Sequence, residues 1–144
     1  MASENGRVIA RTGNGLCTEV TANGYALVAD EPAGLGGTDA GPTPYDYLLA
    51  ALGSCTAMTV RMHADRKGWA LESVRVRMKH DKIHAQDCEG CETESGRIDR
   101  IELELEFEGH LDEQQRRRLK EIAEKCPVHR TLDAEVLIET SLVA

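Results

Sequence analysis

The chain has 144 residues, the size of one ordinary domain, and 41% of them are hydrophobic, which argues against a disordered protein. Its 17 basic and 25 acidic residues give a formal net charge of −8, and an acidic surface argues against nucleic-acid binding, which requires cations for phosphate contacts. No apolar run approaches the ~20 residues that cross a bilayer, and residues 1–7 contain no secretory signal, so we expect a soluble cytoplasmic protein without nucleic-acid or membrane partners.

The first thirty residues predict an antiparallel meander of short strands. Asn23-Gly24 is a strong signal for a tight hairpin turn, and Gly13 and Gly15 suit the turn before it. The predicted strands are Arg7–Arg11, Leu16–Thr21 and Tyr25–Ala29.

A long helix follows the glycine-rich loop Asp30–Gly41. Thr43 is the expected N-cap and Pro44 the first helical residue, and the helix should run to Lys67 before Gly68 ends it. Asp46 lies in the first turn, where a negative charge complements the helix dipole. The stretch 47–58 carries no charge, so we expect protein to enclose this part of the helix on every side.

Two long strands are predicted next, over Leu71–His80 and Arg97–Glu108. Apolar residues alternate with arginine and lysine in the first strand and with glutamate in the second. Because the two charged faces are complementary, we expect antiparallel neighbours, joined by an excursion over residues 81–96. A second helix is predicted over Asp112–Lys125, and a final strand over Val136–Val143. This order of elements predicts an α+β fold.

Five cysteines carry most of the chemical information. An odd number in a chain without a secretory signal does not suggest a disulfide framework, so each is a packed hydrophobe, a metal ligand or a redox group. Cys17 is expected to be buried in its strand. Cys55 in the long helix and Cys126 at a helix end read locally as small core thiols. His129 and Arg130, close behind Cys126, are candidates for stabilising a thiolate.

Two motifs together resemble the OsmC/Ohr family, the osmotically inducible protein C and organic hydroperoxide resistance proteins. They are the segment Gly41–Thr59 around Cys55 and the segment Lys125–Leu132 around Cys126. The resemblance covers the whole chain and lies closer to the OsmC-like branch than to the Ohr proteins proper. It implies a single domain over residues 1–144, in which antiparallel sheets wrap around long central helices in an intertwined homodimer.

The resemblance also implies a thiol peroxidase that needs no bound cofactor. Cys55 would attack a hydroperoxide and become a sulfenic acid, and Cys126 would resolve it to a disulfide. An external dithiol or lipoyl group would restore the pair. Relatives hold an arginine beside the thiolate through an early helix glutamate. Asp46 occupies that helix position here, and Arg11 and Arg130 are the candidate arginines. Asp46 is equally interpreted as compensating the helix dipole.

A second group of candidate site residues lies in and beside the segment 81–96, which connects the two long strands. His80, His84, Cys88 and Cys91 are residue types that zinc prefers, although their spacing is tighter than in common zinc modules. The two cysteines alternatively form a local disulfide in a solvated loop, or a further redox pair. Two functions therefore compete with the peroxidase, both without turnover: an OsmC-like protein that binds small molecules, and a zinc-stabilised structural protein.

Overall fold

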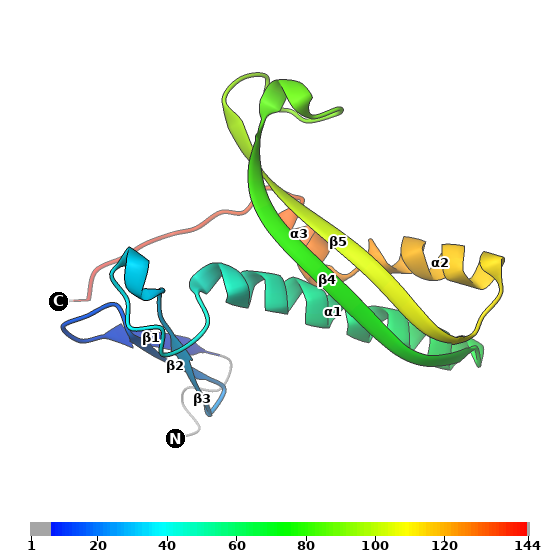
Figure 1. Cartoon of the computed structure of the whole chain (residues 1–144), viewed down its shortest axis with the longest axis horizontal. Helices are drawn as coiled ribbons and strands as arrows, with labels where there is room; N and C mark the ends of the chain where they lie inside the picture. Colours follow the sequence, from blue (N-terminus) through cyan, green and yellow to red (C-terminus); the bar gives the residue numbers. More distant parts are fainter. Residues whose placement is uncertain (1–6, 144) are drawn as a thin grey trace. The chain divides into compact units, whose positions relative to one another are not determined.

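A computed structural model describes residues 7–143, so the first six residues considered above lie outside the described part of the chain. The described chain forms two compact units, one ending at Leu48 and the other beginning at Leu49. Figure 1 follows the elements in chain order, from three short strands through a long helix and two long strands to two further helices. Two antiparallel sheets and a long helix confirm the predicted α+β class.

The first unit contains a three-stranded meander in the order β1-β2-β3. Each strand pairs antiparallel with the next, as predicted. The turn between β2 and β3 has positive φ at Asn23 (49°) and Gly24 (88°), the conformation for which this dipeptide is suited. The strands are β1 (Val8–Thr12), β2 (Thr18–Ala22) and β3 (Tyr25–Ala29).

A buried carboxylate organises the loop that follows β3. Asp30 is 2% exposed, and its oxygens accept hydrogen bonds from the Thr38 hydroxyl (2.6 Å) and from the backbone N–H groups of Glu31, Thr38 and Ala40. The Thr38 hydroxyl and the Glu31 N–H are the main groups that lower the pKa of Asp30 to about 2, against the opposing effect of burial. The carboxylate therefore fixes this loop, which also contains the short 3₁₀-helix η2 (Ala33–Leu35).

Helix α1 (Pro44–Lys67) has the predicted bounds. Thr43 and Asp46 cap it reciprocally: the Thr43 N–H donates to the Asp46 carboxylate (3.0 Å), and the Asp46 N–H donates to the Thr43 hydroxyl (3.1 Å). Its buried residues are Leu52, Gly53, Thr56, Val60 and Ala64. Met58 and Met62, by contrast, are 65% and 60% exposed, so a single chain covers one face of the helix and not its whole circumference.

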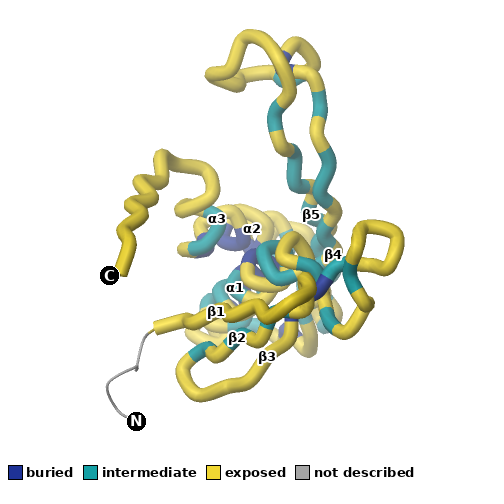
Figure 2. The backbone as a smooth tube through the Cα atoms, turned by 90° about the vertical axis from the view of Figure 1, so that its left-hand side faces the viewer, coloured by how far each residue is buried: buried dark blue, intermediate teal, exposed yellow. Residues whose placement is uncertain are grey.

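Strands β4 (Ala70–His84) and β5 (Arg97–His110) form an antiparallel hairpin. Arg77 lies opposite Glu104 and Lys79 opposite Glu102, which confirms the predicted pairing of basic and acidic faces. The ladder is longer than predicted, because β4 continues to His84 and leaves a shorter loop over residues 85–96. That loop begins with the 3₁₀-helix η3 (Ala85–Asp87). Figure 2 shows exposed residues over most of it.

The core of the second unit lies between α1, β4 and α2 (Glu113–Ala123). Asp112 caps α2, and Gln115 completes the capping box that the sequence predicts. The packed residues are Val60, Ala64, Leu71, Leu119 and Ala123. This core places the second half of α1 against the segment that leads from α2 to Cys126.

The chain after α2 differs from the prediction in two places. Pro127 begins a helix that was not predicted, α3 (Pro127–Leu132), because proline suits the first helical position. The predicted strand Val136–Val143 is absent, and Leu137 and Ile138 in this range are each 82% exposed. An apolar segment such as Val136-Leu137-Ile138 forms a strand only where a neighbour pairs with its backbone, and this segment has no such neighbour within the described chain. Among residues 7–143, no helix is long and apolar enough to span a membrane.

Candidate functional site

Cys55 lies in the middle of α1, where the helix approaches the long hairpin closely. A Cβ atom at Gly53 would collide with the side chain of Met78 in β4, so glycine permits this close approach. Cys55 itself is half-buried and carries a free thiol. The packing therefore holds this cysteine on a rigid helix while leaving part of it accessible.

Cys126 is buried at the junction of α2 and α3. It is 0% exposed, and its sulfur caps α3 by accepting a hydrogen bond from the His129 N–H at 3.3 Å. Pro127 has no N–H group, and the helical turn that it begins directs the next amides toward the sulfur. The sequence Cys-Pro-Val-His thus provides its own hydrogen-bond donors to the thiol.

Thr56 is a member of the site that the sequence did not single out. Its hydroxyl lies 2.7 Å from the Leu52 carbonyl oxygen and 3.6 Å from Cys126 Sγ. A hydroxyl has one hydrogen, so it donates to one of these acceptors at a time. Threonine commonly binds the backbone one turn earlier in a helix, and only the approach of Cys126 in the folded chain reveals a second acceptor.

These donors set the ionisation of Cys126. Burial alone raises the pKa of this thiol, because a thiolate is poorly solvated in the interior. Hydrogen bonds from the His129 N–H, the Thr56 hydroxyl, the Cys55 thiol and the Val128 N–H together outweigh burial and lower the pKa below its usual value. The site therefore favours a negative charge on the buried sulfur.

The fold brings Cys55 and Cys126 together, although they come from segments far apart in the chain. The Cys55 thiol is within hydrogen-bonding reach of the Cys126 sulfur. The resulting pair consists of one accessible and one buried thiol. Two thiols in this arrangement share a hydrogen bond and are candidates to form a disulfide.

The other predicted site residues have different positions. Asp46 belongs to the first unit, and its carboxylate is engaged in the cap of α1 described above. Arg11 lies in β1 of the same unit, and Arg130 is an exposed residue of α3. Cys17 precedes β2 and is exposed, so the prediction that it is buried is wrong. It falls outside the strand because pairing begins at Thr18.

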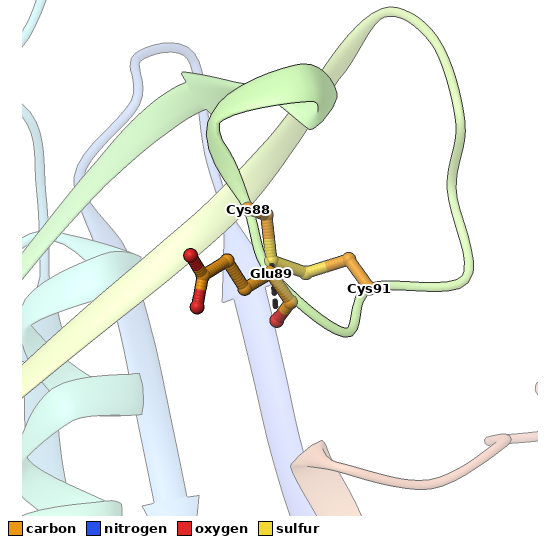
Figure 3. The surroundings of a disulfide bond; sticks show 3 residues. All are labelled: Cys88, Glu89 and Cys91. Carbon is orange, nitrogen blue, oxygen red and sulfur yellow. Dashed lines mark hydrogen bonds between the residues drawn. A yellow bond between two sulfur atoms is a disulfide. The ribbon is translucent and has the colours of Figure 1, made fainter.

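Cys88 and Cys91 form a disulfide in the loop between β4 and β5, as Figure 3 shows. Their sulfurs are bonded to each other, so in this state they offer no thiolate to zinc. His80 contacts the Asp99 carboxylate at 2.8 Å, and His84 is exposed at the end of β4. Across residues 7–143, no three His, Cys, Asp or Glu side chains are grouped in a way that could hold a metal ion.

Comparisons with known proteins agree with this architecture. The model of the OsmC-like protein family matches residues 37–141, which include both cysteine motifs. An organic hydroperoxide resistance protein OsmC from Legionella pneumophila is 22% identical, with a TM-score of 0.62 over 87% of this chain and 88% of that one. OhrB of Bacillus subtilis, also an organic hydroperoxide resistance protein, is 18% identical, with a TM-score of 0.59 over 86% and 87% of the two chains.

A third solved structure, a putative osmotic stress induced and detoxification response protein from Psychrobacter arcticus, is 18% identical. Its TM-score is 0.66, and the match covers 85% of each chain. No curated protein sequence matches this chain. At these identities the solved structures establish the fold alone, whereas the family model spans most of the chain. The chain belongs to the OsmC-like protein family.

Proposed function

We propose that the protein is a thiol peroxidase that reduces organic or small hydroperoxides through Cys55 and Cys126. The observation that carries the proposal is the contact between a half-exposed thiol and a buried sulfur whose pKa is lowered. Peroxide reduction by a thiol pair needs an accessible nucleophile and a second thiol within bonding reach. The hydroperoxide resistance proteins of Legionella and Bacillus, which share this fold, support the same chemistry here.

Cys55 is the proposed nucleophile because it is the accessible member of the pair. The Cys126 sulfur, which accepts a hydrogen bond from the Cys55 thiol, is a neighbouring group that can take the Cys55 proton, and the Cys55 thiolate then attacks the O–O bond. The reaction leaves Cys55 as a sulfenic acid and releases the alcohol after the leaving oxygen takes up a proton. Sulfur thereby loses two electrons and the peroxide gains them.

Cys126 is the proposed resolving thiol. Its sulfur attacks the sulfenic sulfur of Cys55, a disulfide forms, and the hydroxyl group leaves as water. Regeneration begins when an external dithiol or lipoyl thiolate attacks Cys55, the accessible sulfur, and expels Cys126 as a thiolate. The hydrogen bonds that stabilise the Cys126 thiolate also make it a good leaving group. Asp46 supports the pair in this proposal by fixing the start of α1.

A homodimer is part of the same proposal, within a single domain over residues 1–144 and in the cytoplasm. Met58 and Met62 leave an apolar stripe exposed on α1, beside the half-buried Cys55. The segment after α3 exposes Leu137, Ile138 and Leu142 as well. Apolar surface of this extent is typical of an interface, and a second copy would enclose the uncharged helix that one chain leaves partly open.

The peroxidase test is the consumption of cumene hydroperoxide by the full chain with excess dihydrolipoamide. We expect turnover in the wild type and in the Cys17→Ser variant, a matched control that removes a thiol outside the pair. Cys55→Ser should lose turnover, and Cys126→Ser treated with peroxide in the absence of dithiol should accumulate a sulfenic acid at Cys55. After stoichiometric peroxide, peptide mapping should link Cys55 to Cys126. Full turnover by Cys55→Ser would exclude it as the nucleophile.

The oligomeric state is tested separately by sedimentation equilibrium. We expect a mass of two chains for the wild type. Met58→Glu places a charge on the exposed stripe of α1 and should shift the equilibrium toward the monomer without unfolding it. A monomeric wild type at micromolar concentration would contradict the dimer and leave the peroxidase assay unaffected.

A further inference from the structure

The disulfide at the end of the long hairpin is a chemical group that the proposed peroxidase does not use. Cys88 and Cys91 lie in the loop of residues 85–96 that joins β4 and β5. Two residues separate the cysteines, and their Cα atoms are 5.8 Å apart. Figure 3 shows the bond crossing a narrow turn of this loop. The question is whether it is a structural crosslink or a site of thiol exchange.

The loop is anchored by groups other than the disulfide. The β4–β5 ladder continues to the His84–Arg97 pair, and the Ala85 N–H donates to the Gly96 carbonyl at 2.8 Å across the base of the loop. Ala85 is buried there at 4% exposure. A disulfide that encloses so few residues also restricts the unfolded chain less than one that closes a long loop. Reduction should therefore leave the hairpin folded.

The two sulfurs differ in environment. Cys91 is exposed, whereas Cys88 is half-buried. Cys88 Sγ lies 3.7 Å from the carbonyl oxygen of Glu89 (Figure 3). A disulfide sulfur carries no hydrogen, so this contact becomes a hydrogen bond only when reduction makes Cys88 a thiol. The loop thus presents Cys91 for attack and has an acceptor ready for the Cys88 proton.

This disulfide is too far from Cys55 and Cys126 to exchange with them in one chain. Helix α1 meets β4 at Met78, which packs on Gly53, two residues before Cys55. From Met78, β4 runs six residues to His84, about 20 Å at the rise of a strand, and the loop lies beyond it. Figures 1 and 2 both show the end of the hairpin away from α1 and α3. A reaction partner must come from outside the chain.

The charge around the disulfide indicates the class of partner. Four acidic residues lie within the loop, which contains no lysine or arginine, and all four are exposed: Asp87, Glu89, Glu92 and Glu94. Such a loop repels anionic thiols and attracts a reactive sulfur with positive charge beside it.

We propose that Cys88–Cys91 is a second redox site, which exchanges electrons with a dithiol protein whose reactive sulfur lies in a basic surface. The partner thiolate attacks Cys91 Sγ, a mixed disulfide forms, and the bond to Cys88 breaks. Cys88 leaves as a thiolate and takes up a proton. The second thiol of the partner then displaces Cys91, so the partner dithiol loses two electrons and the loop pair gains them.

The first test uses the wild-type chain, because trypsin cleaves after Lys82 and Arg97 and leaves both cysteines in one peptide. The protein is equilibrated with graded mixtures of oxidised and reduced dithiothreitol, alkylated and digested, and the mass of the peptide is measured by mass spectrometry. We expect the loop pair to change from disulfide to dithiol across the series while the circular dichroism spectrum stays constant. The proposal is wrong if Cys88–Cys91 stays oxidised under conditions that reduce Cys55–Cys126, or if it is already a dithiol in fully oxidising buffer. It is also wrong if the hairpin unfolds when Cys88–Cys91 is reduced.

The second test measures the partner class with small thiols of different charge. Glu89→Gln/Glu92→Gln removes two acidic groups and leaves both sulfurs in place. Cysteamine attacks as a zwitterion that carries an ammonium group, whereas mercaptoethanol attacks as an anion. At low salt, the ratio of the cysteamine rate to the mercaptoethanol rate should therefore fall at least about threefold relative to the wild type. An unchanged ratio would refute the basic partner. A matched control, Glu104→Gln on β5, should change neither rate.

Discussion

The role of Thr56 is open to a quantitative test, because valine has nearly the same shape and lacks only the hydroxyl. Thr56 is fully buried, so Thr56→Val preserves the packing of α1 and removes one donor 3.6 Å from Cys126 Sγ. A hydrogen bond to a charged group contributes about 1.5–3 kcal/mol. The long contact to sulfur places this bond at the lower end, about 1.5 kcal/mol. At 1.36 kcal/mol per pKa unit, we expect the pKa of Cys126 to rise by about one unit.

The measurement is the thiolate absorbance at 240 nm as a function of pH. It uses a Cys17→Ser/Cys55→Ser background, in which Cys126 is the remaining free thiol among residues 7–143 and the serine introduced in place of Cys55 keeps a donor near it. In a chain that keeps all its cysteines, Thr56→Val should also slow reduction of the Cys55–Cys126 disulfide, since the departing Cys126 thiolate loses a hydrogen bond.

Thr59 provides a matched control for this substitution. Its hydroxyl donates to the Cys55 carbonyl at 2.8 Å, the same bond to the preceding turn that Thr56 makes to Leu52. Thr59→Val therefore removes a comparable helix bond and should leave the pKa of Cys126 unchanged. A folded Thr56→Val protein whose Cys126 pKa moves by less than about 0.3 units would refute the assigned role of the hydroxyl.

Three further predictions concern stability and are measured by urea unfolding. The pKa of Asp30, about 2, lies below its value in the unfolded chain, so the carboxylate contributes to the free energy of unfolding above about pH 4, and this contribution is lost as the pH falls through 2. Asp30→Asn should abolish this part of the acid dependence. A difference in unfolding free energy between the two proteins that stays constant with pH would contradict the prediction. Leu119→Ala empties a fully buried position and should cost about 2–5 kcal/mol; a loss below about 1 kcal/mol would mean that the core collapses around it. Asp112→Ala removes the cap of α2 and should cost about 1 kcal/mol, whereas an unchanged midpoint would show that water replaces the cap.

Local signals in the sequence predicted most elements correctly. The Asn23-Gly24 turn, the Thr43-Pro44 start of α1 and the Asp112 cap each act over a few residues, and the structure contains all three. The alternation of β4 and β5 also predicted their pairing, because opposite charges on facing strands are readable from the sequence. The failures came where a non-local contact decides: Val136–Val143 contains the apolar residues of a strand but has no neighbouring strand in the described chain.

Helices α1 and α2, the hairpins and the two cysteine motifs could be predicted from the sequence alone, because capping, turn geometry and residue alternation are properties of short segments. The sequence suggested the Cys55–Cys126 pair only through resemblance to a family. Only the folded chain shows that Cys55 is accessible and Cys126 buried, that the Thr56 hydroxyl lies 3.6 Å from the buried sulfur, and that Cys88–Cys91 lies far from both. Exposure, distance and hydrogen bonding between remote segments depend on how helices and strands pack, and no local pattern in the chain records them.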